Sequence, residues 1–240
     1  MNVVISQPML FPWVGMLEQI RLADTFVFYD DVQFSKGSFT NRVQLKTAQG
    51  MAWMTVPLRG LSFGQKIQEV LLDTRQDWRA QHLALLRQAY ADAPFRADML
   101  ALVDAVYGQP HTTIGALSEA SMRSLCRYFG LDQGKRFCHI GELAVPGKGS
   151  QRVLDIVRGL GGERYITGLG ASKYLEHEAF EAAGVSVHYM DYLKQPYPQL
   201  HGAFTPYVSA LDLVAMKGPA GREHLVSGTR HWREHLLQPA

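Results

Sequence analysis

Asp30 and Asp31 stand directly after the apolar residues 26–29 and open the chemically richest stretch of the chain. Residues 30–42 combine two carboxylates, a lysine and an arginine with amide, hydroxyl and aromatic side chains. Polar residues at a strand end commonly face a ligand, because loops carry function while strands hold them in place. Neighbouring residues of an extended chain point in opposite directions, so one carboxylate can serve as general base or metal ligand while the other is anchored to backbone. A loop cap that bonds nearby N–H groups is the alternative.

Positive and amide side chains surround and follow the two acids. Arginine recognises planar carboxylate or phosphate groups through paired hydrogen bonds, so a phosphate-bearing substrate would suit this segment. If the segment after residue 41 is a strand, the arginine and lysine that lie four apart share one face. Ordinary solvated charge is the alternative interpretation. The candidates here are Gln33, Lys36, Asn41, Arg42 and Lys46.

Ser6 and Gln7 follow the first apolar segment, and Trp13 comes shortly after them. These three residues can contact a ligand, or they can form an ordinary turn in which Trp13 packs into the core. Lys148 lies between two glycines at the start of a predicted helix, where backbone N–H groups can seat an anion. The position five residues before it holds Leu143 where a P-loop has glycine, so this is not a P-loop.

Gly168 and Gly170 form a turn between a predicted strand and a predicted helix, where missing side chains let a ligand approach the backbone. Without a third glycine, the pair is weak evidence for a dinucleotide. Tyr174 follows this turn, and Tyr197 belongs to an aromatic, amide-rich segment. Two interpretations of that segment remain: its rings stack on a sugar or base of a ligand, or they pack in the protein core.

Composition narrows the classes of function. The chain has 240 residues, 47% of them hydrophobic, and a net charge of +2, which is too small to indicate nucleic acid by itself. Cys126 and Cys138 are expected to be buried thiols, and no Cys/His spacing indicates zinc or any other metal site. No apolar segment approaches the length of a membrane span and no leader precedes residue 6, so a cytoplasmic protein is expected. No motif in the sequence requires a cofactor, and the sequence does not identify one.

Hydrophobic periodicity predicts an α/β fold with one domain over residues 1–240. A strand–helix–strand unit opens the chain, and strands alternate with helices again after residue 137. Between these halves lie a predicted hairpin over about 42–72, whose last strand covers 66–72, and a helical block over about 77–130. The simplest assembly is an open, mainly parallel sheet with helices on both faces. Ligands bind such sheets at the carboxyl ends of the strands, here loops 6–13, 30–42, 141–150, 168–174 and 191–199.

Two missing motifs count against two enzyme classes. The first histidine is His82, so nucleotidyl transferases of the His-x-Gly-His type, which need imidazoles near the first strand, are disfavoured in their usual form. The Gly-x-Ser-x-Gly elbow of serine hydrolases is absent.

Nearly the whole chain resembles the WbqC-like family. The resemblance runs through Ser-Gln-Pro-Met-Leu-Phe-Pro-Trp-Val-Gly (6–15), Ala-Asp-Thr-Phe-Val-Phe-Tyr-Asp-Asp-Val-Gln-Phe-Ser-Lys (23–36), and segments 41–42, 53–57, 165–174 and 197–212. It implies an enzyme of bacterial surface-glycan, such as O-antigen, or secondary-metabolite biosynthesis. The implied reaction attaches an acyl or aminoacyl group to an amino sugar. Family members commonly have histidine where this chain has Ser6, so its activity or substrate is expected to differ if that histidine is catalytic.

Three hypotheses follow. In the first, a transferase acts on a nucleotide-linked amino sugar: Asp30 or Asp31 takes the proton of the attacking amine, Arg42, Lys46 and Lys148 hold phosphates or an acyl carrier, and Asn41 and the backbone at 168–170 stabilise the oxyanion. The donor can be an acyl thioester or an aminoacyl ester such as a charged tRNA, although the charge does not indicate nucleic acid. The alternatives are an ATP-dependent ligase or nucleotidyl transferase without its histidines, and a noncatalytic ligand-binding protein.

Overall fold

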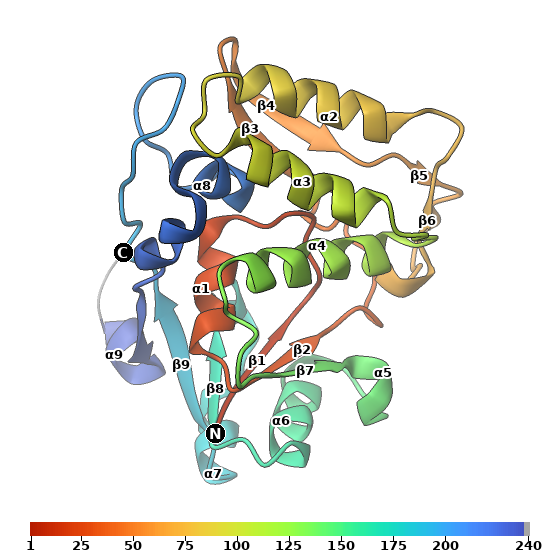
Figure 1. Ribbon diagram of the computed structural model, residues 1–240. Coiled ribbons are helices and arrows are strands. Elements are labelled where there is room, and N and C mark those ends of the chain that lie inside the picture. Colours follow the sequence, from red (N-terminus) through yellow and green to blue (C-terminus); the bar gives the residue numbers. More distant parts are fainter. Residues whose placement is uncertain (238–240) are drawn as a thin grey trace.

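Six strands form the central sheet in the computed structural model, which describes residues 1–237 (Figure 1). Their order is β10-β9-β8-β1-β2-β7, and all neighbours are parallel except β9 and β10. The prediction of an α/β fold with a mainly parallel sheet is therefore confirmed. The strands are β1 (Asn2–Ser6), β2 (Thr25–Phe28), β7 (Arg136–His139), β8 (Arg164–Thr167), β9 (Ser186–Asp191) and β10 (Gly228–His231).

Helices cover both faces of this sheet because its central strands are apolar on both sides. Along β1, Val4 joins the hydrophobic cluster that contains α1 (Val14–Leu22), whereas its neighbours Val3 and Ile5 join a second cluster. That second cluster contains α6 (Gly149–Gly159) and α7 (His177–Ala182). Successive side chains of a strand point to opposite faces, so a continuous apolar run is what a doubly covered sheet requires.

The predicted hairpin consists of β3 (Arg42–Thr47) and β4 (Gly50–Thr55). Gly50 has a positive φ of 111° in its turn, a conformation that favours glycine. The expected strand over 66–72 is correct only at its end, where β6 (Leu71–Leu72) pairs with β5 (Leu58–Arg59). A 3-10 turn, η1 (Ile67–Glu69), replaces its start because the Glu69 carboxylate accepts a 3.0 Å hydrogen bond from the backbone N–H of Lys66.

Three helices follow the hairpin, as the period of 3.6 residues predicts: α2 (Trp78–Ala89), α3 (Arg96–Tyr107) and α4 (Ile114–Tyr128). The side chains of Asp77 and Thr113 cap the first and third of them. Together with α8 (Ala210–Lys217) and the 3-10 helix η3 (Gly218–His224), they pack on the α1 side of the sheet (Figure 1). The remaining helices are α5 (Ile140–Leu143), η2 (Leu169–Lys173) and α9 (Trp232–Leu237).

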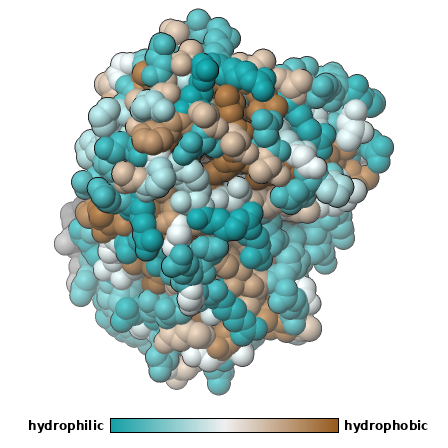
Figure 2. All heavy atoms as spheres, in the orientation of Figure 1, coloured by the Kyte–Doolittle hydropathy of each residue, from teal (hydrophilic) through white to brown (hydrophobic). Residues whose placement is uncertain are grey.

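The surface on the face of Figure 1 is mixed. Figure 2 shows hydrophilic residues over most of it, with hydrophobic residues gathered in separate patches. Among residues 1–237 there is no helix with the length and apolar character needed to cross a bilayer. Both cysteines, Cys126 and Cys138, are buried free thiols.

His82 joins the helical block to the hairpin through two hydrogen bonds. Its ring is buried, with Nε2 3.0 Å from the carbonyl oxygen of Thr55 in β4 and Nδ1 2.8 Å from the hydroxyl of Tyr107 in α3. The neutral ring satisfies both contacts when Nε2–H donates to the carbonyl and Nδ1 accepts from the hydroxyl. Burial lowers the pKa of His82 to about 4, against an ordinary value of 6.5.

Acidification is therefore expected to destabilise this junction. Because the folded protein holds His82 neutral while the unfolded chain protonates it, the stabilisation is complete above pH 6.5 and is lost as the pH falls towards 4. Between pH 7.5 and 5 the loss is about 2 kcal/mol. Urea unfolding at both pH values measures it: the variant His82→Gln is expected to lose about 2 kcal/mol less than the wild type on acidification. An equal loss in both proteins would contradict this assignment.

Candidate functional site

The carboxyl ends of β1, β2 and β8 open onto a cavity of about 780 Å³, which we call the strand-end cleft. Parallel strands bring their following loops to one edge of the sheet, so segments far apart in the sequence meet there. Eight of the sequence-predicted site residues line this cleft: Ser6, Gln7, Asp31, Gln33, Lys148, Gly168, Gly170 and Tyr174. A ninth, Trp13, lines an adjoining cavity.

Asp31 is fixed in the cleft by Arg152 of α6. The guanidinium Nη1 donates to Asp31 Oδ1 over 3.0 Å and Nη2 donates to Oδ2 over 2.5 Å. Nε donates to the carbonyl of Val145 over 2.9 Å, and Nη1 also reaches the hydroxyl of Tyr29. The paired hydrogen bonds to Asp31 raise the pKa of Arg152. A carboxylate offers about four acceptor sites, so Asp31 keeps lone pairs for a ligand while its orientation is set by the arginine.

Asp30 points into the protein instead. It is 4% exposed, and its Oδ2 lies 2.9 Å from Nε2 of His139 on the neighbouring strand β7. The backbone N–H of Gly141 donates to Nδ1 of the same ring, so Nε2 carries the proton that Asp30 accepts. Burial raises the pKa of Asp30, and the nearby His139 opposes that shift. Asp30 therefore supports the edge of the sheet beneath the cleft rather than lining it.

The start of α6 supplies positive potential to the cleft. Lys148 is the exposed residue before the helix and lies between Gly147 (φ 95°) and Gly149 (φ 67°). These positive angles suit glycine and bring the backbone to the cleft surface. Helix N-termini carry unpaired N–H groups and a partial positive charge, and here a lysine adds a full one. The arrangement can bind a phosphate or carboxylate group.

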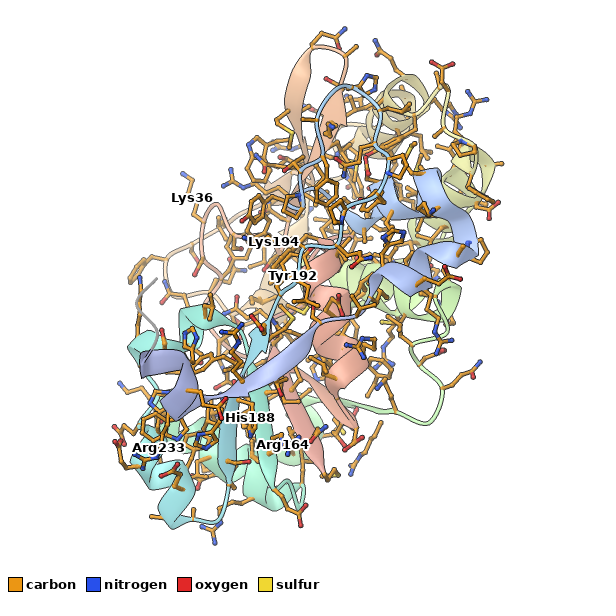
Figure 3. All side chains as sticks on the ribbon, turned by 90° about the vertical axis from the view of Figure 1, so that its left-hand side faces the viewer. Lys36, Arg164, His188, Tyr192, Lys194 and Arg233 are labelled. Carbon is orange, nitrogen blue, oxygen red and sulfur yellow. The ribbon has the colours of Figure 1, made fainter. Side chains whose placement is uncertain are left out.

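A second cavity of about 610 Å³ adjoins the cleft, and both are lined by Gln19, Gly168 and Gly170. We call it the aromatic chamber. Its walls include Trp13 at the start of α1 together with Tyr192 and Tyr207, which follow β9. Figure 3 shows Tyr192 and Lys194 on the segment that leaves β9, above the part of the strand that carries His188.

Three predicted residues at or near the hairpin do not line the cleft, and two of them have partners elsewhere. Lys36 stands on an exposed loop, away from Lys194 and Tyr192 (Figure 3). The Asn41 side-chain amide donates to the carbonyl of Val56 over 3.0 Å, which fixes the hairpin base. Arg42 donates to the carbonyl of Gly37 over 2.6 Å and lies 4.1 Å from the ring centroid of Trp53. We therefore leave these residues out of the candidate site.

Lys46 and Tyr197 are buried and bind other parts of the protein. Nζ of Lys46 lies 2.7 Å from the carbonyl oxygen of Ala203 and 3.1 Å from that of Gly202. Tyr197 packs edge-on against Phe204, and its hydroxyl accepts a hydrogen bond from Gln199. Both hold the segment between β9 and α8, and neither lines the cleft or the chamber.

Comparison with known proteins assigns the chain to a family. The sequence profile of the WbqC-like protein family matches residues 7–224. The chain belongs to the WbqC-like protein family. It is also similar to the uncharacterized protein Rv1507c of Mycobacterium tuberculosis (strain ATCC 25618 / H37Rv), with 30% identity over 227 residues that cover 93% of this chain and 97% of that protein. No solved structure matches the chain significantly.

In this WbqC-like protein, three of the segments that carry the family resemblance meet at the cleft, and one of them, 165–174, supplies Gly168, Gly170 and Tyr174 to it. Segment 6–15 supplies Ser6 and Gln7 to the cleft and Trp13 to the chamber, and segment 23–36 supplies Asp31 and Gln33. Arg152 and Gln19 line the cleft and were missed by the sequence patterns, as was His139, which holds Asp30 beneath it. Arg152 falls one turn inside a predicted helix, where its type and spacing resemble those of any surface arginine.

Proposed function

We propose that the protein transfers an acyl or aminoacyl group to the amine of a nucleotide-linked amino sugar or a similar phosphate-bearing amine. One observation carries the proposal: Asp31 and Lys148, from separate halves of the sequence, line the same cleft at the carboxyl edge of the sheet. A carboxylate suits a substrate ammonium or amine, and the lysine at a helix N-terminus suits its phosphate. The two groups can hold the two ends of one such substrate.

Acyl transfer to an amine needs positioning, a proton acceptor and donors for the oxyanion. In the proposed step the amine nitrogen bonds to the carbonyl carbon of the donor, and the thioester or ester bond breaks. Asp31 accepts the proton that the nitrogen loses and returns it, through solvent where needed, to the departing thiolate or alkoxide. Arg152 keeps the carboxylate aimed at the amine. The backbone at Gly168 and Gly170 lines the cleft and is our candidate for contacting the oxyanion.

A transfer assay tests the proposal. Purified protein is incubated with nucleotide-linked amino sugars and with acyl thioesters or aminoacyl-tRNA, and mass spectrometry detects the acylated sugar. We expect Asp31→Asn to lower turnover by about 100-fold, since general bases contribute at least that much. Lys148→Ala is expected to raise KM by about 10-fold, because it removes a charge-assisted contact to the substrate phosphate.

Lys36→Ala is the matched control, because it removes a lysine that is exposed on a loop outside the cleft. Circular dichroism and thermal melting show whether each variant folds. Full activity in both Asp31→Asn and Lys148→Ala would refute the proposed site.

The same mixtures test the second candidate function, an ATP-dependent ligase or nucleotidyl transferase. The lysine at the start of α6 also suits a nucleotide phosphate, which favours this candidate over a purely structural role for the helix. Release of pyrophosphate or AMP from ATP, dependent on the amino sugar, would replace acyl transfer as the assigned activity. We further propose a role in bacterial surface-glycan or secondary-metabolite biosynthesis in the cytoplasm, on the basis of the family resemblance and substrate class.

A further inference from the structure

The aromatic chamber has no task in the acyl transfer itself, yet it opens onto the cleft where that transfer is proposed. Its residues come from α1 and the residue before it, the turn after β8, strand β9 with the segment that follows it, and the elements β10 and α9. Gly168 and Gly170 line both cavities, so no side chain of these two residues separates them. A ligand longer than either cavity can therefore occupy both.

The side-chain amide of Gln19 lies at the junction of the two cavities. The side chain is 7% exposed and lines both cavities. Its Nε2 lies beside Gly168, where an added Cβ would approach to 3.0 Å. Within residues 1–237 the amide makes no hydrogen bond to another protein group, and it is not among the fully enclosed polar atoms that lack a partner. The amide is therefore accessible from the cavities, and a ligand that crosses the junction can hydrogen-bond to it.

The chamber presents ring faces of the kind on which flat heteroaromatic groups stack. Trp13 holds Tyr192 edge-on at a centroid distance of 5.0 Å and an interplanar angle of 84°. Tyr207 lies 6.5 Å from Trp13 and is 54% exposed, so part of its ring is uncovered. Aromatic side chains that remain partly uncovered beside a polar junction are typical stacking platforms for bases.

Cationic groups stand at the same chamber. Nζ of Lys194 lies 5.6 Å from the ring centroid of Tyr207, and Lys194 has a positive φ of 51°. A non-glycine residue in this region is strained, and such strain gathers at ligand sites. Arg230 and Asp191 form an ion pair of 2.7 Å on the chamber wall. Rings next to a lysine suit a base that carries phosphates.

We infer that the aromatic chamber binds the base of a nucleoside diphosphate. The diphosphate then passes Gln19, Gly168 and Gly170 into the strand-end cleft, where the attached group reaches Asp31. Only the identity of that attached group, an amino sugar, rests on the proposed function. The inference assigns the nucleotide to the chamber and makes Tyr207 and Gln19 determinants of its affinity.

Isothermal titration calorimetry with UDP, dTDP, ADP and GDP tests the inference, with inorganic pyrophosphate as the probe that lacks a base. At least one nucleoside diphosphate is expected to bind at least about 10-fold more tightly than pyrophosphate, because base stacking adds to the phosphate contacts. Tyr207→Ala is expected to weaken that binding by about 10-fold, and Tyr207→Phe, which keeps the ring, to restore most of it. Gln19→Leu is expected to weaken it by about 10-fold through loss of the amide.

A control variant and a second pair of variants test whether these effects are specific to the chamber. Phe63→Ala removes an aromatic side chain that is 98% exposed and lies outside the chamber, and it should leave nucleotide affinity unchanged. At Gly170 an added Cβ meets no atom within 4 Å, so Gly170→Leu can fill the junction without a clash at Cβ, whereas Gly170→Ala adds little volume. Gly170→Leu should weaken binding of the nucleoside diphosphate far more than binding of pyrophosphate.

Two outcomes would overturn the inference: no nucleoside diphosphate binds more tightly than pyrophosphate, or Tyr207→Ala and Gln19→Leu both bind as the wild type does. Acylation of glucosamine 1-phosphate without any nucleotide binding would overturn it while leaving the acyl transfer intact. Base-dependent binding that Tyr207→Ala weakens, in a protein that acylates no amine, would support the inference and refute the proposed function.

Discussion

Arg152→Ala is expected to lower the free energy of unfolding by about 3 kcal/mol and to reduce acyl transfer by up to about 100-fold, the effect expected when Asp31 itself is replaced. The arginine side chain is 9% exposed and that of its partner Asp31 is 19% exposed. Removing the guanidinium leaves the carboxylate of Asp31 half-buried without its cation, and frees the carbonyl of Val145. Unpaired buried charges are among the most destabilising products of a single substitution. Urea unfolding and the transfer assay measure the two effects.

Arg158→Ala is the matched control, because Arg158 lies on the same helix α6 but is exposed. It should change stability by less than about 0.5 kcal/mol. Arg152→Lys keeps the charge and loses the paired geometry, so an intermediate stability is expected. If Arg152→Ala unfolds at the same urea concentration as Arg158→Ala and remains active, the ion pair does not hold the site.

Lys46→Met is expected to cost about 2 to 3 kcal/mol of stability and to loosen the segment that carries the chamber tyrosines. Lys46 is 5% exposed, and its Nζ donates to the carbonyls of Gly202 and Ala203 and lies 3.3 Å from Oε1 of Gln199. Its charge also opposes the rise that burial causes in the pKa of Asp212, which lies at the start of α8 and accepts a hydrogen bond from Tyr90. Methionine fills similar space but leaves these oxygens without their donor.

Limited proteolysis reports the second effect, since cleavage between β9 and α8 should become faster in Lys46→Met. Lys36→Met makes the same chemical change at an exposed loop position and should match the wild type in both measurements. Equal cleavage rates and equal unfolding midpoints for the two variants would show that Lys46 does not clamp the segment.

The sequence predicted the sheet, the hairpin and the helical block because their signals are local. Apolar runs and turns mark β1, β2 and β8, and a period of 3.6 residues marks α2, α3 and α4. The rule that ligands bind at the carboxyl ends of parallel strands then selected Asp31, Lys148 and Gly168, which the folded chain brings to one cleft. The edge strand β10 went unpredicted because Gly-Thr-Arg-His carries no apolar alternation.

Hydrogen-bond and ion-pair partners that are far apart in the sequence could not be predicted from local patterns. A spacing of four residues places Arg42 and Lys46 on one face of a strand, but it does not reveal that Lys46 meets the loop near residue 203. Arg152 meets Asp31 across 121 residues, and Asp30 meets His139 across 109. Such pairs depend on tertiary packing, so charged residues of the same type divide into ligand-facing and structural roles only when the fold is known.

The most direct test of the central claim is a crystal structure of the protein with the nucleotide-linked amino sugar that binds most tightly in calorimetry. The claim predicts that the substrate amine lies within about 3 Å of the Asp31 carboxylate, with a phosphate oxygen beside Nζ of Lys148. Density for the ligand at another surface, with the strand-end cleft left to solvent, would contradict it.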